Sequence, residues 1–333
     1  MHSVSRGAPA GGQAESGSGP LAPRDTRIDR LRGVLVLLMV GGDYLAGVQF
    51  VPAFLKHAPD IGLTVADLVA PCFILVIGLN YGPSFERRSR QSLPDAYRHL
   101  LTRYLGLLGI GAIITAGGTV VAGQPTDWGV LQALGMAGLV AAPFVRLGTP
   151  ARFAVGILIL GAYQYLLNHG MLQSVLSSTH GGFLGSLAWG GLLVLSTAVA
   201  DVWRKGHGPY AACCGVLAVV AAASLLIAPV SKNRVSLSYV LITLAVSALA
   251  LLVTDVLSSG LAARAGYFCW WGENALALYL AHLLLLGLIE LPASPQWYSV
   301  APVWLAVLQL AALLAVTSLV AWWLHRRRIR IGL

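Results

Sequence analysis

Long apolar segments recur along almost the whole chain, and this recurrence constrains the fold more than any other feature. We delimit about ten of them, at residues 33–53, 63–82, 103–122, 129–147, 152–168, 183–201, 210–229, 238–257, 267–291 and 301–324. Each is long enough to cross a hydrocarbon core of ~30 Å. Only helices and closed barrels satisfy their backbone hydrogen bonds in lipid, and these runs are too long and continuous for barrel strands. The sequence therefore predicts an all-α, polytopic transmembrane helical bundle of about ten spans.

The basic residues test that count. With ten spans both termini share one side, and placing them in the cytoplasm leaves only Lys56, Lys232 and Arg234 outside. This is the positive-inside bias of membrane proteins. The net charge of +9 is then explained by topology and by anionic membrane lipids, so no nucleic-acid partner is expected. Residues 1–23, rich in Gly, Ser, Ala and Pro, predict a disordered cytoplasmic tail, and residues 24–333 form the transmembrane domain.

His57 lies in a short polar link, residues 56–68, between the first two apolar segments. Ionisable groups beside a bilayer are costly and indicate a functional site. Two carboxylates follow closely, Asp60 and Asp67. Either could fix the tautomer of the imidazole and support its positive charge, leaving the other nitrogen as a general base or nucleophile. The alternative is a histidine that simply lies at the membrane surface.

Asp43 follows Gly41 and Gly42 in the first apolar segment. It lies ~13 Å along the predicted helix from Val34, near the middle of the bilayer, where a carboxylate costs roughly 2.5–3.5 kcal/mol. The two glycines would let another helix or a ligand come close. Asp43 either pairs with a neighbouring helix for packing or lines a site, and we favour the second interpretation.

Thr64 and Asp67 share one face at the start of the second segment. Pro71 comes four residues after Asp67, so the helical hydrogen bond to the Asp67 carbonyl cannot form. This predicts a kink and a free carbonyl beside a carboxylate. Capping of the helix is the alternative role. We expect it for Thr64, and for Asp67 both interpretations stay open.

Two later segments add polar candidates. Asn274 and His282 are eight residues apart, so on one helix they share a face that points into the bundle. They form either an interhelical hydrogen bond or part of a pocket. The outer loop at 229–234 contains Lys232 and Asn233. This loop could bind an anionic acceptor or lipid headgroups, or it could pair with Asp60.

On the predicted cytoplasmic side, Asp29, Arg32 and Arg103 lie near the ends of apolar segments. Such arginines can receive the phosphates of a nucleotide-like cofactor, although charges that only set topology are the alternative. All four cysteines lie inside predicted spans, at Cys72, Cys213, Cys214 and Cys269, without the spacing of metal ligands. We therefore interpret them as packing residues and expect no metal site.

Several of these residues together resemble the heparan-α-glucosaminide N-acetyltransferase family. The resemblance rests on the Asp29-Arg30-Leu31-Arg32-Gly33 start, on His57-Ala58, and above all on Gly62-Leu63-Thr64-Val65-Ala66-Asp67-Leu68-Val69. Further likeness lies at residues 181–189 and 227–241, and at Gly272, Asn274, Tyr279 and His282. The similarity spans most of residues 27–290, and the chain resembles a bacterial-type catalytic core of this family.

The resemblance implies an acyltransferase of the cell (inner) membrane that takes an acetyl group from cytosolic acetyl-CoA. The acceptor would be an amino-sugar-like molecule or glycan on the other face, and a homodimer is one arrangement it allows. His57 would be catalytic. Asp43 stands where the family has an asparagine, which puts the acceptor and the acyl group in question more than the chemistry. The main alternative is a multi-pass transporter or flippase of a small polar or lipid-linked substrate, because polar groups at mid-membrane also line transport paths.

Overall fold

The structure, a computed structural model, describes residues 25–122, 128–259, 266–291 and 297–331; the predicted tail at 1–23 lies outside these ranges. Within them the chain is helical and has no strand, as predicted. The helices are α1 (Thr26–Gly47), α2 (Val65–Ser89), α3 (Leu93–Ala122), α4 (Val130–Ala141), α5 (Thr149–Leu166), α6 (Leu172–Leu176), α7 (Gly182–Arg204), α8 (His207–Ser224), α9 (Leu237–Ser259), α10 (Tyr267–Glu273), α11 (Ala275–Glu290) and α12 (Val303–Arg326). A π-helical turn, Leu167–Met171, joins α5 to α6.

Each predicted apolar segment falls on one of these helices or on a bent pair. In the described ranges seven helices are long and apolar enough to span a membrane, and the α10–α11 pair, bent by 89°, would make eight. The apolar helix at Val130–Phe144 is shorter. Helix α1 has 22 residues but carries Arg30, Arg32 and Asp43. The structure thus supports a multi-pass membrane protein, and the count of ten stays a prediction.

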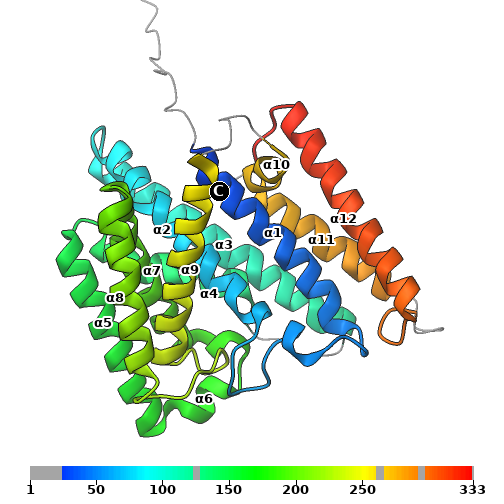
Figure 1. Ribbon diagram of the computed structural model, residues 1–333, viewed down its shortest axis with the longest axis horizontal. Coiled ribbons are helices and arrows are strands. Elements are labelled where there is room, and N and C mark those ends of the chain that lie inside the picture. The colour runs from blue at the N-terminus through cyan, green and yellow to red at the C-terminus, as the bar shows by residue number, and fades with distance from the viewer. Residues whose placement is uncertain (1–24, 123–127, 260–265, 292–296, 332–333) are drawn as a thin grey trace, which may run out of the picture.

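The helices form two packed groups (Figure 1). The larger contains α2 to α9, and its apolar core lies around the enclosed helix α7; this core runs from Ile28 to Leu251 and includes Ile28, Leu31 and Leu35 of α1. The smaller contains α1 and α10 to α12, with a core that includes Val40, Tyr44 and Trp271. Helix α1 contacts both α2 and α9 across the seam between the groups. The chain crosses this seam at the link between α1 and α2, which carries His57.

The first and last described residues lie at the same end of the bundle, at the top of Figure 1. Arginines gather at this end: Arg27 forms a 2.8 Å ion pair with Asp255 near the end of α9, and Arg152 pairs with Asp201 near the end of α7. The links before α2 and before α9 lie at the opposite end. The helices thus separate an arginine-rich end from the end that carries His57, whereas the side of the membrane stays a prediction.

Two glycines bring the backbones of α1 and α10, both in the smaller group, together at the arginine-rich end. A Cβ atom added at Gly33 in α1 would overlap the carbonyl of Phe268, and one at Gly272 in α10 would overlap the carbonyl of Asp29. Such small residues let helices approach closely. The glycines singled out from the sequence are different, because a Cβ at Gly41 or Gly42 would meet no atom of the described chain within 4 Å.

We predict that Gly33→Ala destabilises the protein by about 1–3 kcal/mol, because the new methyl group overpacks the contact between α1 and α10. Thermal unfolding of the detergent-solubilised protein measures this effect. Gly41→Ala in the same helix is the matched control and should leave the midpoint unchanged or raise it, since alanine favours helix over glycine. Equal midpoints for the two variants would contradict the close contact.

Candidate active site

His57 and Asp67 form an ion-paired dyad at the start of α2. The Nδ1 atom of His57 lies 2.8 Å from Oδ1 of Asp67. The imidazole side chain is 44% exposed, whereas the carboxylate is fully enclosed. Because an ionised carboxylate can only accept a hydrogen bond, Nδ1 carries the hydrogen and Nε2 is left with its lone pair. The structure thus brings together two of the three residues that the sequence suggested as catalytic.

Asp67 caps α2, which confirms one interpretation of it, and it also faces His57, while its functional role stays a prediction. Its Oδ2 atom accepts hydrogen bonds from the Thr64 amide at 3.1 Å, the Thr64 hydroxyl at 2.9 Å and the Ala58 amide at 3.2 Å. These bonds cap α2 and close the preceding link. Oδ1 remains for His57. The capping contacts therefore hold the carboxylate in the position from which it orients the imidazole.

The predicted free carbonyl of Asp67 exists and has a partner. Pro71 lies inside α2 and has no amide hydrogen, so the Asp67 carbonyl is available to another donor. The Tyr239 hydroxyl of α9 donates to it at 2.8 Å, and Tyr239 is fully buried. The hydrogen bond that Pro71 removes from α2 is thereby replaced by one from a side chain of α9. This hydrogen bond ties the dyad to α9.

Lys232 is the third charged member of the site. Its Nζ lies 3.6 Å from Oδ1 of Asp67, and only 8% of the residue is exposed. Burial lowers the pKa of Lys232, while the neighbouring Asp67 carboxylate opposes that shift. A cation from a loop more than 160 residues away therefore faces the same oxygen as His57, which the sequence alone did not indicate.

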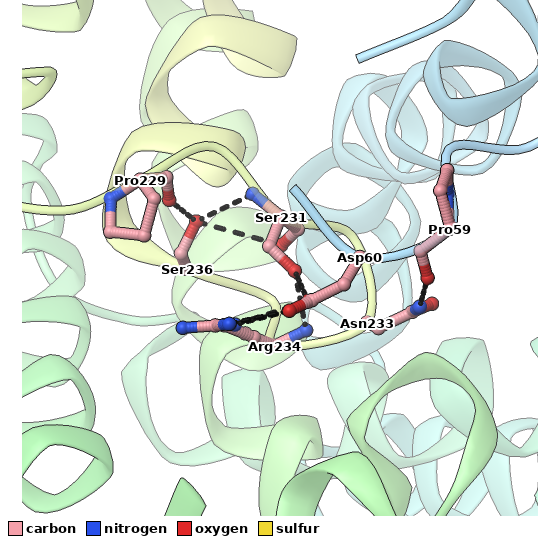
Figure 2. Close-up of polar contacts among 7 residues, drawn as sticks. All are labelled: Pro59, Asp60, Pro229, Ser231, Asn233, Arg234 and Ser236. Atoms are coloured by element: carbon pink, nitrogen blue, oxygen red, sulfur yellow. Dashed lines mark hydrogen bonds and ion pairs between the residues drawn. The ribbon is translucent and has the colours of Figure 1, made fainter. Parts of the chain in front are cut away.

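Figure 2 shows how the link between α1 and α2 is joined to the loop before α9. Nε of Arg234 donates to both carboxylate oxygens of Asp60, at 3.0 and 3.1 Å, and the Ser231 hydroxyl donates to Asp60 at 2.7 Å. The amide of Asn233 donates to the carbonyl of Pro59. Of the two carboxylates near His57, Asp60 therefore holds the loops together and Asp67 faces the imidazole. A ligand-binding role for Asn233 stays a prediction.

Asp43 forms a second carboxylate–histidine pair. Its Oδ2 lies 2.9 Å from Nε2 of His282 in α11, which is fully buried, while the Asp43 side chain is 36% exposed. The packing interpretation of Asp43 is therefore correct in part, since it does pair with a neighbouring helix. Its partial exposure also leaves it able to line a site. Lys232 lies within electrostatic range of Asp43, which places the second pair near the first.

Asn274 and His282 are both fully buried, as predicted, but they do not share one face. The helix breaks at Asn274, and α10 and α11 meet there at 89°, so a spacing of eight residues does not place the two side chains on one face. The buried amide of Asn274 donates to the Ile329 carbonyl at 3.1 Å and accepts from the Ile331 amide at 2.7 Å. Asn274 thus holds the C-terminal segment at the arginine-rich end, opposite His57.

The remaining predicted residues lie at that same end. Asp29 and Arg32 form a 2.8 Å ion pair, and Arg32 also donates to the Gly272 carbonyl at 3.1 Å. Arg103 lies over the ring of Tyr104 and lines a narrow cleft between α2 and α3. Its Nε atom is enclosed without a hydrogen-bond partner among the described residues. These three residues form no single cluster with His57.

His180 is a site residue that sequence reasoning missed. It precedes α7 and lies within electrostatic range of Lys232, His57 and Asp67. The only signal in the sequence is the pair of glycines that follows it, Gly181 and Gly182, which permit an unusual backbone. In the described part of the chain no three His, Cys, Asp or Glu side chains gather as metal ligands would.

The fold and site define a helical membrane protein with a carboxylate-oriented histidine at one end of the bundle, a group suited to proton or acyl transfer. Residues 24–203, more than half of the chain, match the family described as "Heparan-alpha-glucosaminide N-acetyltransferase, catalytic". The chain belongs to this family, which confirms the resemblance. The matched region contains the dyad and His180.

A relative supports the assignment over a shorter stretch. Heparan-alpha-glucosaminide N-acetyltransferase of Homo sapiens is 43% identical over 58 residues, which cover 17% of this chain. They cover only 8% of the human protein. The donor, acceptor and residue roles in this chain are therefore matters for proposal.

The ion pair of Asp60 with Arg234, which joins the two loops, yields a prediction about how stability depends on pH. Arg234 lowers the pKa of the Asp60 carboxyl, so the stabilisation from this pair is complete above the ordinary value of ~3.9 and is lost as the pH falls through the lower folded value. A double-mutant cycle of Asp60→Asn and Arg234→Gln, measured by thermal unfolding, should give a coupling of about 0.5–1 kcal/mol between pH 8 and pH 5. The coupling should shrink below about pH 4. A coupling that grew on acidification would contradict this account.

Proposed function

We propose that the protein transfers an acyl group, in the first instance acetyl, from cytosolic acyl-CoA to an amine or hydroxyl on the outer side of the cell membrane, with an amino sugar as the favoured acceptor. The observation that carries the proposal is the His57–Asp67 dyad, with Nδ1 bound at 2.8 Å and the imidazole partly exposed. Membership of an acetyltransferase family supplies the reaction class.

His57 is the group that handles the proton. In the direct mechanism its Nε2 takes the proton of the acceptor amine as the nitrogen attacks the thioester carbonyl carbon. A C–N bond forms, the C–S bond breaks, and the CoA thiolate leaves with the proton that His57 held. In the two-step mechanism Nε2 itself attacks the thioester carbonyl carbon, the C–S bond breaks and the CoA thiolate leaves. The acceptor amine then attacks the acyl-imidazole, the bond to Nε2 breaks, and the proton that the amine loses neutralises the thiolate.

Asp67 and Lys232 keep the charge balanced while this happens. Asp67 stays ionised and stabilises the imidazolium that forms on His57. When the imidazole is neutral, Lys232 at 3.6 Å compensates the enclosed carboxylate, whose charge would otherwise be costly to bury. Asp43, held by His282 and partly exposed, is placed to meet the acceptor.

The donor would enter from the opposite, arginine-rich end. Arg103 lines the cleft between α2 and α3 together with His99, Asn80 and Ser84, which offer donors to phosphate oxygens. Coenzyme A carries too much charge to cross lipid, but its pantetheine arm is narrow and largely uncharged. We therefore assign the phosphates to the Arg103 end and the thioester to the His57 end.

We predict that His57→Ala lowers transfer of labelled acetyl from acetyl-CoA by about 10²- to 10⁴-fold, because the proton acceptor is gone. Binding of acetyl-CoA should stay within about twofold, since His57 is far from the phosphates. Purified protein with a panel of amino sugars provides the measurement, and His169→Ala, at an exposed histidine elsewhere, is the control.

Other outcomes of that assay discriminate the mechanisms. Near-normal turnover by His57→Ala would contradict the proposed role of His57 in the transfer. Label retained on the wild-type protein after a quench, and absent from His57→Ala, would select the two-step mechanism. Uptake of an amino sugar into vesicles without acetylation would point to a transporter instead.

A further inference from the structure

The backbone is strained where the chain enters α7. His180, Gly181 and Gly182 have φ angles of 54°, 76° and 60°, all in the left-handed region. Glycine adopts such angles readily, whereas a histidine does so only when its surroundings require it. Backbone strain of this kind is common at functional sites. The residue that bears the strain here is His180, in the site that contains the dyad.

The surroundings fix His180 from several sides. The indole nitrogen of Trp189 donates to the His180 carbonyl at 3.0 Å, and the two rings meet edge to face at 6.4 Å. A Cβ atom at Gly185 would lie 2.9 Å from that same carbonyl oxygen, so only glycine allows this approach. A Cβ at Gly181 would lie 2.8 Å from Val235, next to the loop of Lys232.

A chain of contacts connects His180 to the dyad. Trp189 packs edge to face on Tyr239 at 6.0 Å, and the Tyr239 hydroxyl donates to the carbonyl of Asp67. His180 also lies within electrostatic range of Lys232, His57 and Asp67. The strained histidine is therefore part of the same polar site, held by aromatic side chains that also support Asp67.

The ring of His180 lacks one hydrogen bond. Its Nδ1 atom is enclosed and has no hydrogen-bond partner among the described residues. Enclosed polar atoms nearly always have a partner, and each exception calls for an explanation. The proposed reaction brings one oxygen into this site that needs a donor, the carbonyl oxygen of the thioester. Its charge grows as the acceptor attacks, and a preorganised N–H group stabilises that charge.

We propose that the Nδ1–H group of His180 donates a hydrogen bond to the thioester oxygen of the acyl donor and forms the oxyanion hole. This inference rests on the proposed function. As the acceptor nitrogen bonds to the carbonyl carbon, the C=O electron pair moves to this oxygen, and His180 holds it without giving up its proton. The pair returns when the C–S bond breaks, and the thiolate leaves.

Two non-reacting ligands isolate this hydrogen bond. One is the ketone analogue of acetyl-CoA in which a methylene group replaces the sulfur, and the other is S-ethyl-CoA, which lacks the carbonyl oxygen. Wild-type protein should bind the ketone about 3- to 10-fold more tightly, the range expected for one neutral hydrogen bond. In His180→Ala this preference should disappear, while the affinity for S-ethyl-CoA stays unchanged. Isothermal titration calorimetry on the solubilised protein measures both.

Turnover should follow the same pattern. His180→Ala should lower kcat about 10²- to 10³-fold, as expected for loss of one oxyanion donor. His180→Asn should stay within about tenfold of wild type, because the asparagine amide nitrogen replaces Nδ1 and asparagine tolerates a positive φ. His57→Ala is the matched comparison: it should lose turnover but keep the preference for the ketone.

The possible results separate the two proposals. A ketone preference that persists in His180→Ala overturns the oxyanion role, and so does an equal loss of affinity for both ligands, which would indicate a structural role. In either case the assignment of His57 stands. If wild-type protein binds neither ligand, the acyl-CoA donor is wrong and the inference falls with it.

Discussion

The enclosed carboxylate of Asp67 is the interaction on which the rest of the structure depends. One of its oxygens caps α2 and closes the preceding link, and the other faces His57 and Lys232. A buried charge of this kind is costly unless every lone pair is used. The requirement draws together the link between α1 and α2, the loop before α9 and, through Tyr239, α9 itself. The packing of the loops at the His57 end and the position of the imidazole therefore depend on the same carboxylate.

Much of this site could be predicted from the sequence because its first elements are local. His57 and Asp67 are ten residues apart, and a threonine three residues before an aspartate is a recognisable cap. Because proline has no amide hydrogen, Pro71 alone predicts that the Asp67 carbonyl lacks its helical hydrogen bond. The donor to this carbonyl, Tyr239, could not be predicted, because residues 172 positions apart meet only through packing. Lys232 is a similar case, because nothing near it in the sequence indicates Asp67.

One prediction from the sequence failed because it assumed a continuous, straight helix. The spacing of Asn274 and His282 places them on one face only if one straight helix holds both, and the chain turns by 89° at Asn274, where α10 ends and α11 begins. No proline marks that turn. His180 was missed because its signal is a backbone angle of 54°, which a sequence does not display. For Asp43 the structure shows the pairing with a neighbouring helix, the interpretation that the sequence favoured less, because a charge at that depth needs a partner and His282 is that partner. Its role in lining a site stays a prediction.

The contact between Gly33 and Gly272 also limits how an acyl donor could travel. At that level the backbones of α1 and α10 touch, with the Phe268 carbonyl against Gly33 and the Asp29 carbonyl against Gly272. A pantetheine arm is wider than the space left between two such backbones. No passage to His57 can therefore run between these two helices while they stay in contact. The cleft beside Arg103, between α2 and α3, and the other flank of α1, at its seam with α2 and α9, are not closed by this contact.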